Sequence, residues 1–146
     1  MSPLQHRAPG LVGACFNHPG VSASVIPDGH HVDYAAIQIA KKQMGDRLFV
    51  ITDSVTETNI GYYQHVFEGD KYTSNGILSG SALTMNKAVY NLVHHAGISL
   101  SEALRMCSLY PARVMNMSDK LGLIREGYLA KMAVLDNEMS VVKLID

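Results

Sequence analysis

Three side chains stand at positions where α/β enzymes commonly carry catalytic groups. Asp53 directly follows the apolar run 48–52, and the end of a buried strand is a typical site for a catalytic carboxylate, although turn aspartates are also common there. His30 and His31 follow the strand-like run 21–26 and a Pro-Asp-Gly turn. Because successive side chains of an extended chain point to opposite sides, at most one of the two histidines can face a site at the strand ends. The other is then a surface or helix-capping residue.

Arg7 is a candidate ligand for an anion. It lies in the segment His6–Gly10, which contains proline and glycine. Arginine is the natural bidentate partner of a phosphate, although a lone arginine in such a loop is more often only solvated. The sequence has no H-x-H, H-E-x-x-H or C-x-x-C spacing and therefore no recognisable metal site. It also lacks a P-loop, a G-x-G-x-x-G fingerprint and a G-x-S-x-G nucleophile motif.

The elements that must position these residues form a strand–helix–strand unit. Asp33 opens a helical pattern that Gly45 ends, and its apolar stripe consists of Ile37, Ala40 and Met44. The run Leu48–Ile51 is apolar without interruption, which predicts a strand buried on both faces, as in a parallel sheet covered by helices. Together with the run 21–26 this is one βαβ unit. Two such strands, or three with the region before Val21, cannot close a barrel, and a strand that is apolar on both faces needs neighbours on both edges. We therefore expect a piece of a larger α/β domain or a chain that pairs with another.

The pattern of apolar and polar residues changes after Asp53. A hairpin is predicted in 62–72 around Gly69-Asp70, followed by a loop at 78–81 and a helix at 82–96. Ser99 and Glu102 have the spacing of a capping box for the next helix, which Pro111 interrupts. Short strands are predicted at 132–135 and 141–145.

Composition narrows the class of protein. The chain has 146 residues and a formal net charge of −1, so nothing indicates a nucleic-acid surface. No apolar stretch approaches the roughly 20 residues of a membrane span, and the first residues have no apolar core of a secretory signal. We therefore expect a cytoplasmic protein that binds neither nucleic acid nor membrane, with Cys15 and Cys107 as buried thiols.

Several stretches together resemble one family, the N-acetylglucosamine-6-phosphate deacetylases of the amidohydrolase superfamily. They follow in the family's order along essentially the whole chain and are residues 1–10, 26–34, 50–54, 78–85 and 109–113. The resemblance implies an α/β fold in which residues 1–120 are the C-terminal part of a (β/α)8 TIM barrel of the amidohydrolase type. Residues 121–146 are then strands of a small β-sandwich. Family tails usually have Ala-Asp-Leu where this chain has Ala130-Lys131-Met132.

The resemblance also implies the reaction and its residues. The reaction is hydrolysis of the acetamide of N-acetylglucosamine 6-phosphate to glucosamine 6-phosphate and acetate. Asp53 matches the catalytic aspartate, and His31 matches the histidine that contacts substrate and polarises the carbonyl. Arg7 matches the phosphate-binding arginine. The segment Leu78, Ser79, Gly80 matches a loop that contacts substrate.

A divalent metal ion, zinc or iron, is implied in the intact enzyme. The ligands of the family, a glutamate and two histidines, lie upstream of the part that Met1 begins, so we expect this chain to hold no metal ligand and to be inactive alone. The expected partner is a small-molecule substrate, and the intact enzyme is expected to be a homodimer.

Two other interpretations of the function remain open. Another amidohydrolase, dihydroorotase-like or adenine-deaminase-like, would share Asp53, and a comparison of phosphorylated with unphosphorylated substrates would separate it from the deacetylase. A non-catalytic sugar-phosphate-binding fragment would explain the missing metal ligands but would leave Asp53 without a purpose.

Overall fold

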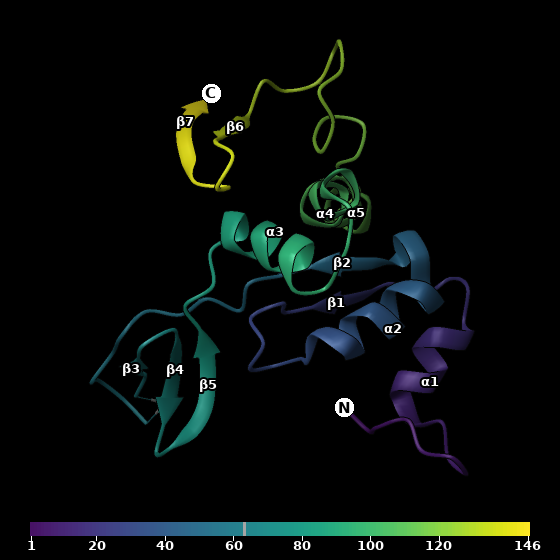
Figure 1. Ribbon diagram of the computed structural model, residues 1–146, viewed down its shortest axis with the longest axis vertical. Coiled ribbons are helices and arrows are strands. Elements are labelled where there is room, and N and C mark those ends of the chain that lie inside the picture. The colour runs from purple at the N-terminus through teal and green to yellow at the C-terminus, as the bar shows by residue number, and fades with distance from the viewer. Residues whose placement is uncertain (63) are drawn as a thin grey trace.

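The computed structural model describes residues 1–62 and 64–146 (Figure 1). Its centre is a strand–helix–strand unit made of β1 (Ala23–Val25), α2 (Tyr34–Met44) and β2 (Leu48–Val50). The two strands are parallel, with Ala23 opposite Leu48, which confirms the predicted βαβ unit. Asp33 caps α2 by accepting a 2.7 Å hydrogen bond from the backbone N–H of Ala35.

A helix that the sequence did not indicate precedes this unit. It is α1 (Gly10–Asn17), which lies beside α2 (Figure 1). A short 3-10 turn, η1 (Gly45–Arg47), joins α2 to β2. Arg47 ends this turn and donates hydrogen bonds to four backbone carbonyls of α1 and the loop after it, those of Cys15, Phe16, His18 and Val21.

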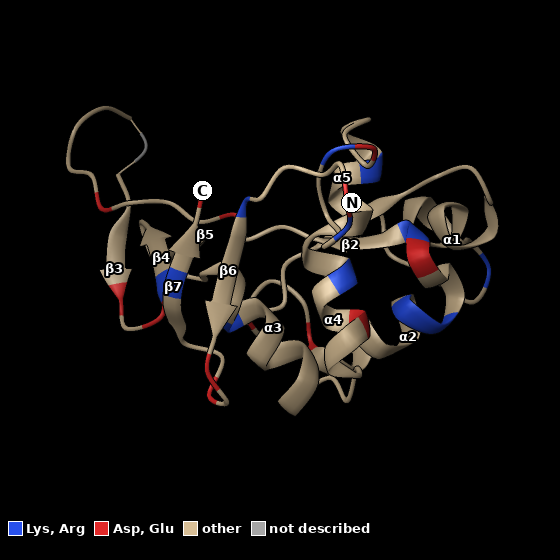
Figure 2. Ribbon diagram, turned by 90° about the horizontal axis from the view of Figure 1, so that it is seen from above, with Lys and Arg blue, Asp and Glu red and all other residues tan. Residues whose placement is uncertain are grey.

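A separate antiparallel sheet follows Asp53. Its strands are β3 (Val66–Glu68), β4 (Lys71–Ser74) and β5 (Ile77–Ser81). The turn at Gly69-Asp70 joins β3 to β4, as predicted. The prediction of a loop at 78–81 is wrong, because these residues pair with β4 as a strand, Gly80 opposite Tyr72. In two perpendicular views this sheet lies at the opposite end of the molecule from α1 (Figures 1 and 2).

Three helices follow this sheet in the chain: α3 (Met85–His94), α4 (Leu100–Cys107) and α5 (Leu109–Val114). The last two pack against β2. The predicted capping box fails, because Ser99 makes no side-chain cap bond and the carboxylate of Glu102 binds Lys41, Arg105 and Tyr110 instead. Pro111 lies in the first turn of α5, where its missing N–H costs nothing. In the described part of the chain, no helix is long and apolar enough to cross a membrane.

The chain ends in a two-stranded antiparallel hairpin. Its strands, β6 (Met132–Leu135) and β7 (Val141–Ile145), have the bounds predicted from the sequence. The side chains of Val142 and Leu144 are exposed on it. Lysine, arginine, aspartate and glutamate side chains of both signs are spread over the ribbon rather than gathered on one face (Figure 2).

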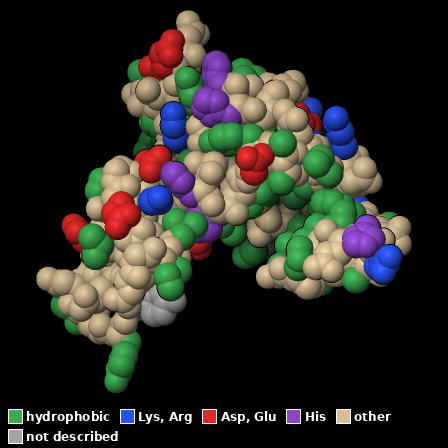
Figure 3. Space-filling model, turned by 60° about the horizontal axis from the view of Figure 1, so that its bottom comes forward, with side chains coloured by type: hydrophobic (Ala, Val, Ile, Leu, Met, Phe, Trp, Pro, Cys, Tyr) green, Lys and Arg blue, Asp and Glu red, His purple; other side chains and the backbone are tan. Residues whose placement is uncertain are grey.

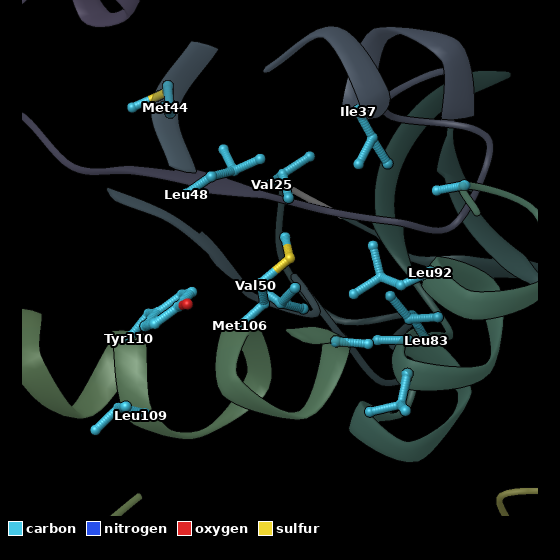
Figure 4. Close-up of a cluster of buried hydrophobic side chains, with 14 residues drawn as sticks. Val25, Ile37, Met44, Leu48, Val50, Leu83, Leu92, Met106, Leu109 and Tyr110 are labelled. Atoms are coloured by element: carbon cyan, nitrogen blue, oxygen red, sulfur yellow. The ribbon is translucent and has the colours of Figure 1, made fainter. Parts of the chain in front are cut away.

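The core lies between α2 and the helices α4 and α5 (Figure 4). Val25, Leu48 and Val50 project from the strands into it, Ile37 and Met44 reach it from α2, and Met106 and Tyr110 reach it from the other side. The other face of β2 differs from the prediction. Phe49 is only half-buried, at the margin of the core, and Ile51 is 37% exposed.

Candidate active site

The carboxyl ends of β1 and β2 meet at one edge of the parallel pair. The backbone N–H of Ile51 donates to the carbonyl of Val25 at 3.0 Å, so the segments that follow both strands leave side by side. The first carries His31 and the second carries Asp53. Their side chains converge, with Nε2 of His31 3.5 Å from Oδ2 of Asp53. The structure therefore brings together the two residues that the sequence named as catalytic candidates.

Asp28 holds His31 from the other side. Its Oδ1 accepts the backbone N–H groups of His30 and His31 at 2.9 and 2.8 Å, and its Oδ2 lies 2.7 Å from Nδ1 of His31. The Asp28 side chain is only 4% exposed. Burial alone would raise the pKa of Asp28, but the hydrogen bonds from His31 and His30 outweigh burial, and its pKa lies below the ordinary value.

The charge on Asp28 fixes the protonation pattern of the His31 ring. An ionised carboxylate only accepts hydrogen bonds, so Nδ1 of His31 must carry a proton. In the neutral ring Nε2 is then an acceptor, and in the cationic ring it is a donor toward Asp53. Sequence reasoning missed Asp28, although its place three residues before His31, in an Asp-Gly turn, was a usable signal.

The neighbouring histidine takes a different direction. Nε2 of His30 donates to Oδ1 of Asp70 at 3.0 Å, in the turn between β3 and β4. This agrees with the prediction that at most one histidine of the pair can face the strand-end site. The face seen in Figure 3 carries several histidine side chains close to acidic ones.

The predicted substrate loop is the strand β5. Leu78 and Ser79 are half-buried and Gly80 is buried. The hydroxyl of Ser79 lies 2.9 Å from Nδ1 of His65. The next residue, Ser81, donates its backbone N–H to the carbonyl of Asp53 at 2.9 Å, so β5 adjoins the catalytic candidates.

Arg7 lies apart from the His31–Asp53 pair. It is exposed in a tight turn closed by a bridge between Gln5 and Ala8. Within the described residues it makes no hydrogen bond or ion pair with His31, Asp53 or any other group. The N-terminal segment that carries it lies with α1, away from the three-stranded sheet (Figure 1). The structure does not bring Arg7 to the site.

Two open hollows occur elsewhere on the surface. One of about 210 Å³ lies at the amino ends of the parallel strands, between Arg47, Phe49 and Arg113. Another of about 400 Å³ lies between α2 and the α3–α4 connection. Neither contains a residue named above as catalytic. Among residues 1–62 and 64–146, no group of three metal-ligating side chains converges.

Comparison with known proteins decides the family. The model of the amidohydrolase family matches residues 24–145. The chain belongs to the amidohydrolase family. An N-acetylglucosamine-6-phosphate deacetylase of Haemophilus influenzae is 35% identical over 153 residues, which cover 97% of this chain and 40% of that relative.

Other relatives carry the name of the epimeric substrate. An N-acetylgalactosamine-6-phosphate deacetylase of Escherichia coli is 32% identical over 152 residues, which cover 99% of this chain and 40% of that protein. A shorter protein of another strain, named a candidate for the same activity, is also 32% identical, and the match covers 91% of its length.

A solved structure supports the same relationship. The crystal structure of N-acetylglucosamine-6-phosphate deacetylase from Pasteurella multocida matches with a TM-score of 0.92 and 36% identity, over 99% of this chain and 40% of that one. The chain thus spans about 40% of the length of the deacetylases from Haemophilus and Pasteurella.

Proposed function

We propose that this chain is the C-terminal part of a deacetylase that hydrolyses N-acetylglucosamine 6-phosphate to glucosamine 6-phosphate and acetate. The observation that carries the proposal is the convergence of His31 and Asp53 at the shared carboxyl end of two parallel strands. The names of the Haemophilus relative and the Pasteurella structure support the same substrate. We expect the complete enzyme to be cytoplasmic.

The architecture that we propose has two parts. Residues 1–120 belong to a (β/α)8 barrel and residues 121–146 to a small β-sandwich. The partly exposed side chains of Phe49 and Ile51 support the first assignment, because the inward-pointing side chains of other barrel strands would cover them. The exposed side chains of Val142 and Leu144 support the second, because a further sheet would bury them.

In the reaction, water adds to the acetamide carbonyl carbon and the carbon–nitrogen bond then breaks. Asp53 accepts a proton from the attacking water and delivers it to the leaving nitrogen, so the carboxylate is regenerated. His31, with both ring nitrogens protonated, donates from Nε2 to the carbonyl oxygen as negative charge develops there. Asp28 keeps the ring oriented for that donation.

We assign substrate binding to residues outside the His31–Asp53 pair. Leu78, Ser79 and Gly80 would contact the sugar, and their strand adjoins Asp53 through Ser81. Arg7 would bind the phosphate, so that binding energy far from the acetamide positions it for attack. The assignment of Arg7 rests on the resemblance. Because Arg7 is exposed and makes no contact with the pair among the described residues of its own chain, we propose a homodimer in which this turn faces the partner's site.

The amidohydrolase family is generally metal-dependent. The described residues do not fit a metal site by themselves, because Asp28 and Asp53 lie on opposite sides of the His31 ring and no third ligand joins either of them. We therefore propose that the ligands of a divalent ion, zinc or iron, come from residues outside this chain. The chain alone is then inactive.

N-acetylgalactosamine 6-phosphate is the second candidate substrate. The two sugars differ only in the orientation of the 4-hydroxyl, and the Escherichia coli relatives carry the galactosamine name at nearly the same identity. Neither His31 nor Asp53 discriminates the epimers, because both are assigned to the acetamide.

The deciding experiment measures acetate release by the full-length protein that contains residues 1–146, loaded with Zn²⁺ or Fe²⁺. The substrates are N-acetylglucosamine 6-phosphate, its galactosamine epimer and unphosphorylated N-acetylglucosamine. We expect turnover that requires the phosphate, with the higher kcat/KM on the glucosamine compound. Equal turnover of the unphosphorylated sugar, or none by a folded and metal-loaded protein, would overturn the proposal in favour of another amidohydrolase substrate.

A further inference from the structure

Asp53 has an unusual backbone conformation. Its φ angle is +51°, in the left-handed region that residues with a side chain adopt only at a cost in free energy. The strand β2 ends at Val50, so its pairing with β1 does not hold Asp53, which lies beside a single parallel bridge between Ser54 and Ser81. Its side chain is half exposed. The conformation must therefore be maintained by contacts of the neighbouring peptide groups.

Ser81 binds the peptide groups on both sides of Asp53. Its hydroxyl donates to the carbonyl of Thr52, and its backbone N–H donates to the carbonyl of Asp53 at 2.9 Å. These two carbonyls belong to the two peptide planes whose rotation defines φ and ψ of Asp53. A single residue thus fixes both backbone angles of the catalytic candidate.

Further contacts make this attachment rigid. The carbonyl of Ser81 accepts the N–H of Val55 at 3.1 Å, and its hydroxyl accepts the N–H of Leu83 at 3.0 Å. Ser81 is fully buried. A buried hydroxyl that both donates and accepts has no water to replace a lost partner, so its removal leaves buried polar groups unpaired.

The strand β5 also approaches the Asp53 segment closely. A Cβ atom on Gly80 would lie 2.6 Å from a methyl group of Val55, so only glycine allows this spacing. The close approach keeps Ser81 within hydrogen-bond distance of Thr52 and Asp53. The same strand carries Leu78 and Ser79, so the substrate segment and the catalytic carboxylate share one support.

We propose that Ser81 is a positioning residue: it holds Asp53 in its left-handed conformation and thereby aims the carboxylate at His31. This role rests on the proposed function, because it matters to turnover only if Asp53 transfers protons. Whether Ser81 holds the backbone of Asp53 can be tested separately, without measuring activity.

The first test is amide hydrogen exchange of the 146-residue chain, with Ser81→Ala compared to wild type. The substitution removes the hydroxyl but leaves the backbone bonds from residue 81 to Asp53 and from Val55 to residue 81 available. If the hydroxyl fixes this segment, both amides exchange at least about tenfold faster. Unchanged rates at both, with faster exchange only at Leu83, would overturn the proposal.

Thr73→Val is the matched control. Thr73 lies in β4 of the same sheet, is buried, and donates its hydroxyl to Oε1 of Glu68 at 2.7 Å. Thr73→Val removes one buried hydroxyl at nearly constant side-chain volume. We expect it to leave the amide exchange rates of Ser81 and Val55 unchanged. Ser81→Cys, with a weaker donor of similar shape, should give intermediate rates and serves if the alanine variant does not fold.

The second test is kinetic and uses the full-length, metal-loaded protein. We expect Ser81→Ala to lower kcat about 10- to 100-fold with KM within about twofold, because the carboxylate is misdirected while the substrate contacts remain. Thr73→Val should leave both constants unchanged. An equal loss in both variants would overturn the positioning role, whereas no acetate release by the wild type would count against the proposed function and leave the exchange rates to decide on Ser81.

Discussion

The ring of His31 is fixed by the carboxylate of Asp28 through a 2.7 Å contact between Nδ1 and Oδ2. The other oxygen of Asp28 accepts two backbone N–H groups, so three hydrogen bonds hold this carboxylate in its orientation. Burial opposes its charge, yet these hydrogen bonds keep the pKa of Asp28 below the ordinary value. At neutral pH the Nδ1 proton of His31 therefore stays in place.

Asp28→Asn should disturb the reaction through the protonation state of His31. Asparagine can still accept the two backbone N–H groups on its oxygen, but it then presents an NH₂ donor to Nδ1, which must accept and so loses its proton. The ring is then neutral, with its proton on Nε2, and a neutral ring is a weaker donor to the carbonyl oxygen than the doubly protonated ring of the proposed reaction. We expect kcat of the full-length, metal-loaded protein to fall about 10²- to 10³-fold with little change in KM. Nitrogen-15 NMR of the His31 ring in the 146-residue chain should show the loss of the Nδ1 proton.

Asp70→Asn is the control for that variant. It removes the carboxylate that binds the neighbouring ring of His30 at 3.0 Å, but Asp70 is largely exposed and lies outside the proposed machinery. Near-wild-type kcat is expected, because exposed ion pairs contribute little. Equal losses in the two variants would contradict a specific role of Asp28.

Asp53→Asn should separate catalysis from binding. Asparagine tolerates the left-handed backbone at φ +51° better than most residues, so the fold around position 53 should be kept. The amide cannot accept the proton of water, and we expect kcat to fall about 10²- to 10⁴-fold while affinity for substrate changes little. A variant that turned over at the wild-type rate would show that Asp53 is not the proton acceptor.

The sequence predicted those elements whose signals are local. The strands 132–135 and 141–145, the cap at Asp33 and the turn at Gly69-Asp70 were all found as expected. The convergence of His31 with Asp53 could also be predicted, because parallel strands bring their carboxyl ends to one edge.

Features that depend on distant contacts could not be predicted. Ser79, Gly80 and Ser81 have a loop composition but form a strand, because they pair with β4 and with the Asp53 segment. The helix α1 has no capping side chain at Pro9; the distant Ser2 accepts the N–H of Leu11 instead, and Arg47 binds carbonyls at the other end of the helix. Asp28 looked like an ordinary turn residue, since spacing alone does not reveal that its side chain is buried.

Glu102 should contribute stability that disappears in acid. Burial raises the pKa of this carboxyl, but hydrogen bonds from Lys41, Tyr110 and Arg105 outweigh burial and lower its pKa from 4.5 to about 2. The unfolded chain therefore takes up the proton first as pH falls. The contribution is complete above pH 4.5 and is lost progressively toward pH 2.

Glu102→Gln should lower the free energy of unfolding by about 1–3 kcal/mol at pH 7, measured in urea, and by less as the pH is lowered toward 3. The exposed Glu57→Gln should change it by less than about 0.5 kcal/mol at either pH. A difference between wild type and Glu102→Gln that stayed constant from pH 7 to 3 would contradict the assigned pKa.

Arg47 should anchor the N-terminal segment to the strand–helix–strand unit. Its Nη1 donates to the carbonyls of Cys15, His18 and Val21 at 3.0, 2.8 and 2.6 Å, and the first of these belongs to α1. Lysine keeps the charge but lacks the planar fork that reaches several carbonyls at once. We expect Arg47→Lys to destabilise the chain by about 1–3 kcal/mol.

The loss should be local, which gives the variant a clear signature. Amide exchange should accelerate in residues 10–21, whereas the NMR signals of the His31 ring should keep their wild-type positions, because the strand-end site does not contact Arg47. Arg125→Lys, an exposed substitution of the same kind, should leave both observations unchanged. If Arg47→Lys shifted the His31 signals as strongly as it loosened α1, the arginine would support the whole βαβ unit rather than the attachment of the N-terminal segment.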